Sequence, residues 1–142
     1  MRHSEIKFIN HKAENLFNLV SDVKKYPEFL PWCLGSRVKK INENNLRADL
    51  IVGFKIYREV FKSNVKLNKD KFEIQVEYID GPFQKLNNFW SFKNKNTGCE
   101  VNFLVDFTFS KRILNTVLEN FFSEAVKKMV KAFEERANSL YN

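Results

Sequence analysis

Glycine, proline, cysteine and histidine are all scarce in this chain of 142 residues, which contains four, three, two and two of them. Four glycines make a glycine-rich phosphate-binding loop improbable. The two cysteines, Cys33 and Cys99, lie far apart and match no zinc-ligand spacing, and two histidines do not make a metal site. We therefore expect two buried free thiols and no bound metal.

Long apolar runs are missing as well. No segment approaches the roughly 20 apolar residues that span a bilayer, and residues 1–12 lack the apolar centre of a secretory signal. These absences predict a cytoplasmic protein, whose membrane contacts would be peripheral, on the inner face of the plasma membrane. The length predicts a single domain over residues 1–142, with a core of its own.

Motifs for catalysis are also absent from the sequence. It contains neither the G-x-S-x-G pattern of serine hydrolases nor the H-E-x-x-H pattern of zinc proteases. A cysteine nucleophile needs a positioned base, whereas His3 and His11 both lie near the N-terminus. Asp106 stands between apolar neighbours, and strand alternation explains it as a solvent-facing residue. We predict that the chain is not an enzyme and uses no cofactor.

Phenylalanine and positive charge are the abundant features. The chain has 15 phenylalanines and a net charge of +7. Residues 24–71 carry 12 basic and 5 acidic side chains, so the whole excess lies in one third of the chain. Such a segment is either an ordinary solvated face or a surface for the phosphate groups of RNA or lipid.

The hydrophobic periodicity predicts an α+β fold. Ala13–Val23 has helical spacing. Lys24–Leu30 predicts a short second helical turn, whose length Pro27 and Pro31 limit. Residues 111–140 form an apolar stripe without glycine or proline, which predicts one helix about 45 Å long. A curved antiparallel sheet of about seven strands would pack around that helix. The predicted strands cover residues 5–9, 37–42, 46–54, 55–68, 71–79, 86–93 and 100–110, with a break at Asp80-Gly81-Pro82.

Two segments carry a family resemblance. The first is residues 26–33, YPEFLPWC, and the second is residues 80–83, DGPF, followed by Leu86, Trp90 and Phe92. With the order of elements, they resemble the coenzyme Q-binding START-domain family, part of the polyketide cyclase-like superfamily, whose bacterial branch is called ribosome association toxins. Residues 9–12 depart from the family pattern at the start of the first helix. The resemblance implies a helix-grip fold with an apolar tunnel between sheet and helix.

The resemblance also implies that the protein binds a polyprenyl quinone, ubiquinone, without turnover. The protein would then act as a lipid carrier or chaperone for respiration and quinone biosynthesis. Aromatic rings along a dry slot can stack on a quinone ring. Plain core packing explains the same aromatic residues at least as well. The side chains predicted to contact the ligand are Phe54, Trp90, Phe92, Phe107 and Phe121.

The Pro-rich segment is a candidate gate to the tunnel. Its apolar residues lie close to Lys24 and Lys25, and an apolar tip beside cations suits an anionic membrane interface. The alternative is a stiff loop that simply closes the core. The predicted gate and membrane-contact residues are Phe29, Leu30 and Trp32, with Phe83 as a second lip.

The resemblance implies an alternative function as a toxin-like factor that binds the ribosome and blocks association of its subunits. Strand alternation places Arg58, Lys62 and Lys66 on one face, and double-stranded RNA is read by shape and backbone, so no base-reading motif is required. Both a membrane and ribosomal RNA would use the same positive charge. The cations predicted to contact an anionic surface are Lys24, Lys25, Arg37, Lys39, Lys40, Arg58, Lys62 and Lys66.

Overall fold

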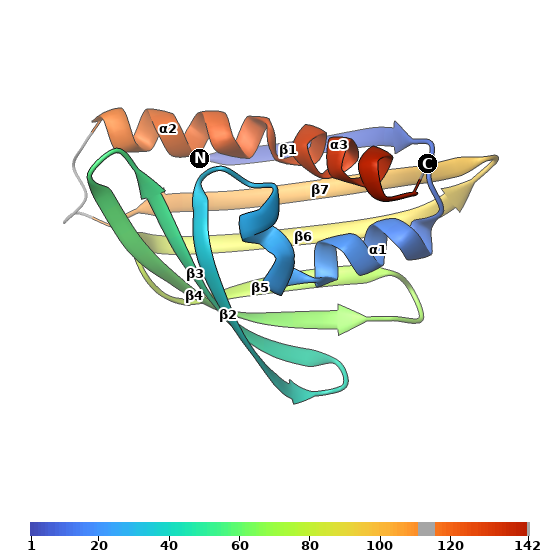
Figure 1. The fold of residues 1–142 in the computed structure, drawn as a ribbon, viewed down its shortest axis with the longest axis horizontal. Coiled ribbons are helices and arrows are strands. Elements are labelled where there is room, and N and C mark those ends of the chain that lie inside the picture. The colour runs from blue at the N-terminus through green and yellow to red at the C-terminus, as the bar shows by residue number, and fades with distance from the viewer. Residues whose placement is uncertain (111–115, 142) are drawn as a thin grey trace.

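Seven antiparallel strands form one curved sheet in a computed structural model that describes residues 1–110 and 116–141 (Figure 1). The strand order is β1-β7-β6-β5-β4-β3-β2, so only β1 leaves chain order, by pairing with the last strand. The strands are β1 (Arg2–Ile9), β2 (Cys33–Asn42), β3 (Asn45–Phe54), β4 (Tyr57–Asn68), β5 (Glu73–Asp80), β6 (Phe83–Lys95) and β7 (Gly98–Phe109).

The helices occupy two places in the chain. Helix α1 (Ala13–Ser21) and the 3₁₀ helix η1 (Val23–Glu28) lie between β1 and β2, and α2 (Thr116–Lys127) and α3 (Met129–Tyr141) follow β7. Helices α2 and α3 run one after the other along the sheet, and α1 lies beside α3 (Figure 1). This arrangement confirms the predicted α+β helix-grip fold with two short helices after the first strand.

The C-terminal helix differs from the prediction of one uninterrupted element. It is divided at Lys128 into α2 and α3, and the first residues of the predicted helix, 111–115, lie outside the described residues. The backbone hydrogen bonds continue through the break, because Lys128 N–H donates to Glu124 and Ala132 N–H donates to Lys128. Since the sheet is curved, a divided helix can lay the apolar side of both halves against it.

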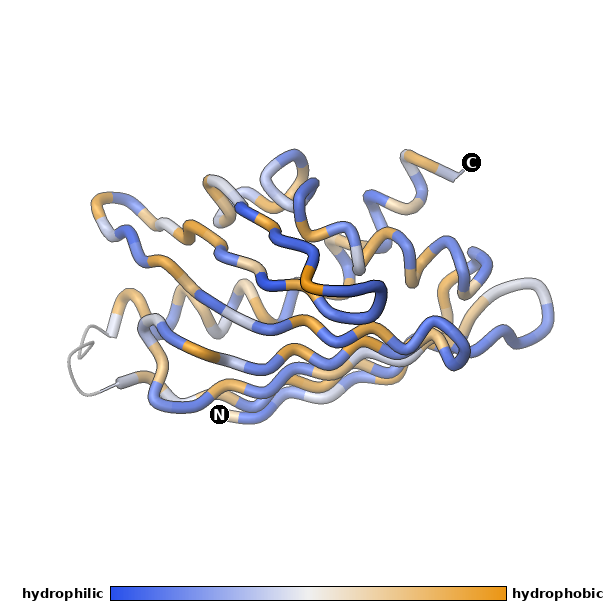
Figure 2. The backbone as a smooth tube through the Cα atoms, turned by 90° about the horizontal axis from the view of Figure 1, so that it is seen from below, coloured by the Kyte–Doolittle hydropathy of each residue, from blue (hydrophilic) through white to orange (hydrophobic). Residues whose placement is uncertain are grey.

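The strands follow the alternation of the sequence. On β3, Ala48, Leu50 and Val52 are buried, whereas Arg47, which precedes Ala48 on the same strand, is exposed. Figure 2 shows apolar and polar residues alternating along the strands. Because successive side chains point to opposite faces, one face of the sheet meets the helices and the other faces away from them. All seven predicted strands are present, and their bounds shift by a few residues; β2, for example, begins at Cys33.

The predicted break at Asp80-Gly81-Pro82 is the turn between β5 and β6. Gly81 has φ +148°, and a Cβ atom there would lie 2.8 Å from the carbonyl oxygen of Val60. Glycine adopts this backbone conformation without a steric penalty, whereas other residues do not. The turn brings Phe83 into the core, where its ring stacks on Phe109 at 5.0 Å.

Candidate functional site

A cavity of about 120 Å³ lies between the sheet and the helices. Its walls come from strands β3 to β7, from α1, η1, α2 and α3, and from the segment that joins η1 to β2. Most of the lining is apolar or aromatic. The lining residues are Val20, Val23, Tyr26, Trp32, Ala48, Leu50, Val52, Phe61, Ser63, Val65, Ile74, Val76, Phe83, Leu86, Asn88, Trp90, Phe103, Val105, Phe107, Phe122, Ala125, Val126, Met129 and Phe133.

The cavity offers no charge to a ligand. Among the described residues, none that lines it carries a carboxylate, ammonium, guanidinium or imidazole group. The Tyr26 hydroxyl donates a hydrogen bond to the Val20 carbonyl, and burial raises the pKa of this phenol. An ionised ligand would therefore lose its hydration without gaining a counter-charge. The cavity suits an uncharged, largely apolar molecule.

Two polar side chains of the lining carry no aromatic ring. Ser63 on β4 is buried, and Asn88 on β6 is half-buried. The Asn88 amide accepts a hydrogen bond from Trp90 Nε1 at 3.1 Å and donates one to the Leu104 carbonyl at 2.8 Å. These two bonds fix which way the amide faces, because an indole only donates and a carbonyl only accepts.

The five predicted ligand-contact residues divide into two groups. Trp90 and Phe107 line the cavity. Phe92 is absent from the lining; its ring packs against those of Phe17 and Trp90, with ring centroids 6.5 and 5.9 Å apart. Phe54 and Phe121 stack on each other, with centroids 4.3 Å apart, outside the lining.

The four predicted gate residues have different surroundings. Leu30 and Phe83 are 1 % and 8 % exposed, so neither offers surface to a membrane in this conformation. Trp32 lines the cavity, as Phe83 does. Phe29 packs edge-on against the Phe133 ring of α3 at 5.2 Å. The segment after η1 therefore forms part of the cavity wall, and its role as a gate stays a prediction.

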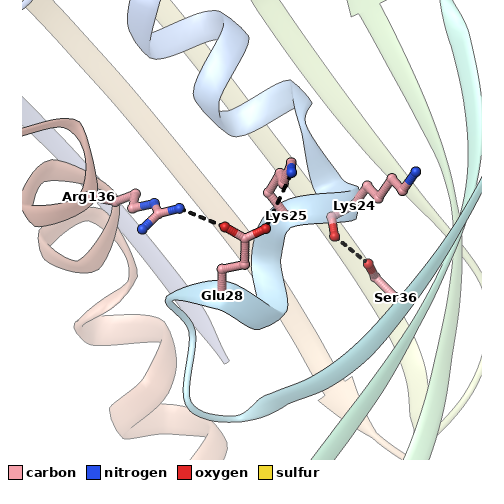
Figure 3. Close-up of polar contacts among 5 residues, drawn as sticks. All are labelled: Lys24, Lys25, Glu28, Ser36 and Arg136. Atoms are coloured by element: carbon pink, nitrogen blue, oxygen red, sulfur yellow. Dashed lines mark hydrogen bonds and ion pairs between the residues drawn. The ribbon is translucent and has the colours of Figure 1, made fainter. Parts of the chain in front are cut away.

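An ion pair joins η1 to α3, and we call Glu28 and Arg136 the latch. Arg136 Nη2 lies 2.9 Å from Glu28 Oε1, and the guanidinium stands 5.3 Å from the centre of the Phe29 ring. Lys25 Nζ approaches Glu28 Oε2 at 3.4 Å, and Ser36 on β2 donates to the Lys24 carbonyl at 3.0 Å (Figure 3). The latch thus fastens the wall segment next to Tyr26 and Trp32 to the C-terminal helix.

Removing the latch should speed ligand exchange with little effect on stability. In an Arg136→Gln variant we expect ligand release to be about two- to fivefold faster, because a surface ion pair contributes at most about 1 kcal/mol. Stopped-flow displacement measures the rate, and urea unfolding measures the stability. The matched control is Lys127→Gln, which breaks an exposed ion pair to Glu124 on α2. Equal release rates in the two variants would show that the latch does not control ligand exchange.

Positive charge gathers on the sheet face that points away from the cavity. We call this group the basic face, and its side chains are on β2, β3 and β4. The cross-strand pairs Arg37 with Asp49, Lys39 with Arg47 and Lys62 with Asp49 place these residues side by side. Ala48 and Leu50 line the cavity, so the residues that alternate with them point outward. The members of the basic face are Arg37, Lys39, Arg47, Arg58, Lys62 and Lys66.

The predicted cations do not all belong to the basic face. Arg58, Lys62 and Lys66 share a face of β4, as their spacing predicts. Lys66 is paired with Glu77 at 2.6 Å, which reduces its availability to a partner. Lys40 pairs with Leu46 and alternates to the opposite side of β2, and Lys24 and Lys25 lie on η1.

Most of the polar lining and the latch escaped the sequence analysis. Ser63 stands between Phe61 and Val65 in an apolar row of alternating residues, and Asn88 stands between Leu86 and Trp90 in another. A polar residue in a row of otherwise apolar, inward-facing residues can indicate a cavity wall, since a solid core would favour an apolar side chain at that position. The latch joins residues 108 positions apart, and no local pattern marks such a pair.

The described residues hold no arrangement typical of catalysis. Cys33 and Cys99 are free and buried, as predicted, and burial raises the pKa of each thiol to about 11. Both thiols therefore stay protonated near neutral pH and are poor nucleophiles. Asp106, on the outer face, pairs with Lys85 at 3.3 Å. Over residues 1–110 and 116–141, no cluster of side chains could hold a metal ion. None of the helices described is both long and apolar enough to cross a membrane.

Comparisons with known proteins agree with this architecture. The family model described as "Polyketide cyclase / dehydrase and lipid transport" matches residues 9–134. The ribosome association toxin RatA of Rickettsia prowazekii is 34% identical over 137 residues, covering 94% of each chain. The mitochondrial coenzyme Q-binding protein COQ10 homolog B of Xenopus laevis is 32% identical, over 99% of this chain and 59% of that protein. The solution structure of an 18 kDa protein from Caulobacter crescentus is 34% identical, with a TM-score of 0.76 over 99% of this chain and 98% of that one.

Proposed function

Because the chain belongs to the polyketide cyclase / dehydrase and lipid transport family, we propose that it binds a polyprenyl quinone of the ubiquinone class. The protein does not transform the quinone but holds it in the cavity as a carrier or chaperone. The observation that carries the proposal is the lining of the cavity, which is aromatic, apolar and without ionisable acids or bases among the described residues. The coenzyme Q-binding relative supports the choice of ligand class.

The size of the cavity limits how a quinone could enter. A cavity of about 150 Å³ accepts a molecule such as benzene, and this cavity, at about 120 Å³, is smaller than that. Burial of an isoprenoid tail gains about 25 cal/mol per Å² of apolar surface, but the tail needs additional space. The proposal therefore requires η1, or α2 and α3, to move away from the sheet when the complete ligand binds.

The test is direct binding of ubiquinone to the protein. Protein purified from cells should release a quinone into organic solvent, which mass spectrometry identifies. Added short-tailed ubiquinone should quench the intrinsic fluorescence, because both tryptophans of the chain, Trp32 and Trp90, line the cavity. A clean extract together with no binding of added quinone would refute the proposal.

A second candidate function is supported by the basic face. Arg47 and Lys39 form one cross-strand pair of cations, and Arg37 and Lys62 flank Asp49 on either side. A row of cations across three strands suits the phosphate backbone of folded RNA. The relatives named ribosome association toxin support a ribosomal partner. In this function the protein would bind a ribosomal subunit and oppose subunit association.

Charge reversal separates this function from quinone binding. In an Arg47→Glu/Lys62→Glu variant we expect ribosome binding to fall at least about tenfold at low salt, because each phosphate contact contributes to counterion release. Sucrose-gradient sedimentation of ribosomes at two salt concentrations measures the effect. The control is Lys131→Glu, an exposed cation on α3 away from the sheet. Subunit profiles that wild-type protein leaves unchanged at low salt would exclude the ribosomal function.

A further inference from the structure

Ser63 places a polar side chain in the lining of the cavity. The residue is 2 % exposed and lines the cavity. Its neighbours across the sheet are Ala48 on β3 and Tyr78 on β5. A serine hydroxyl can donate one hydrogen bond, whereas an alanine in this apolar row would offer a ligand none.

Asn88 has hydrogen-bonding capacity to spare. A carboxamide has two N–H donors and two acceptor lone pairs. One lone pair accepts from Trp90 Nε1, and one N–H donates to the Leu104 carbonyl. A second N–H therefore remains, on a side chain that the other two bonds already hold in place. A ligand would meet this donor without any cost for ordering a flexible side chain.

The two donors stand on the cavity side of strands that flank β5. Ser63 pairs across the sheet with Tyr78, and Asn88 pairs with Val76, two residues earlier on β5. Strands lie about 4.8 Å apart and rise about 3.4 Å per residue, so two strand spacings and an offset of two residues place the two backbone positions about 12 Å apart. A ring with acceptor oxygens on opposite edges, each about 2.8 Å from its donor, matches such a span.

We propose that the Ser63 hydroxyl and the remaining Asn88 N–H donate hydrogen bonds to the two carbonyl oxygens of the quinone ring. This inference rests on the proposed quinone-binding function and adds an orientation to it. The ring lies over β4, β5 and β6, while the aromatic lining covers its faces. The two donors, Ser63 and Asn88, favour binding of uncharged rings with two hydrogen-bond acceptors over binding of plain hydrocarbons. It also selects against carboxylate lipids, because no cation lines the cavity among the described residues.

The test compares Ser63→Ala with the wild-type protein and with Ser91→Ala. Ser91 is also a buried serine on the sheet, but it does not line the cavity. The probes are decylubiquinone and decylbenzene, which share the tail but not the carbonyls. We expect Ser63→Ala to bind decylubiquinone about three- to tenfold more weakly and decylbenzene unchanged. Its thermal unfolding midpoint should be equal to or above that of wild type, and Ser91→Ala should bind both probes as wild type does.

Infrared spectroscopy reports each hydrogen bond separately. With isotope-labelled carbonyls, both quinone bands should shift to lower frequency in the wild-type complex, and only one should shift in Ser63→Ala. If Ser63→Ala binds both probes like wild type, or loses both equally, the proposed hydrogen bond is wrong, although quinone binding stands. If wild-type protein binds decylubiquinone no better than decylbenzene, the orientation is wrong as well. If wild type binds neither probe, the proposed function itself fails.

Discussion

Replacing Ala125 by phenylalanine is expected to abolish quinone binding while the protein stays folded. Ala125 lies on α2, is half-buried and lines the cavity. A benzyl group added there extends into a space of only about 120 Å³, so a quinone ring and the new side chain would compete for it. We expect the affinity for short-tailed ubiquinone to fall at least about tenfold, measured by quenching of tryptophan fluorescence.

The matched control for this filling experiment is Val117→Phe on the same helix. Val117 is 51 % exposed, so the same kind of enlargement there leaves the cavity unchanged, and binding should be retained. The Ala125→Phe variant should also keep any activity toward ribosomes, since the basic face is on the opposite side of the sheet. Undiminished quinone binding by a folded Ala125→Phe protein would show that the ligand uses another site.

Truncation of Phe133 to alanine is expected to give the largest loss of stability. Phe133 is 3 % exposed, and its ring meets Trp90, Tyr26 and Phe29 edge-on at 5.2 to 5.3 Å. It is therefore the point at which α3, η1 and the sheet meet. Removal of a buried phenylalanine side chain costs about 3–5 kcal/mol, through lost burial and the space left behind.

Urea unfolding followed by circular dichroism measures that loss. We expect a lower midpoint and an unchanged dependence on urea concentration, which indicates a change in stability rather than in the unfolded state. The control is Phe8→Ala on the outer face of β1, where the ring is 50 % exposed and the cost should stay below about 1 kcal/mol. A loss below about 1 kcal/mol for Phe133→Ala would contradict the central packing role of this ring.

Alternation in the sequence predicted the sheet because it reflects a local rule. Side chains on a strand point to opposite faces, so the rows Ala48, Leu50, Val52 and Phe61, Val65 identify the buried face without knowledge of the fold. The order of the elements and the long apolar stripe then favoured a sheet around a C-terminal helix. The interruption at Lys128 was not predictable in this way, because neither glycine nor proline marks it.

The candidate site was less predictable because it depends on docking between distant elements. Phe92 and Trp90 share one row of β6, but α1 places Phe17 over Phe92 and leaves Trp90 beside the cavity. In the same way, the sequence predicts Leu30 as a gate residue, whereas its side chain is buried in the core of the fold. The spacing of residues along a strand predicts on which face of the sheet each side chain lies. The packing of the helices on that face then determines which side chains line the cavity.

The pairing of β1 with β7 has a consequence for how the chain folds. Arg2 lies opposite Asp106, and Met1 donates a hydrogen bond to the Phe107 carbonyl, so the first strand joins the sheet only when the last strand is available. Contacts this distant along the chain slow folding, because the intervening loop must close first. During synthesis from the N-terminus, the first strand must wait for its partner until about three quarters of the chain has been made. The helices that close the cavity come later still, which makes ligand capture a property of the finished chain alone.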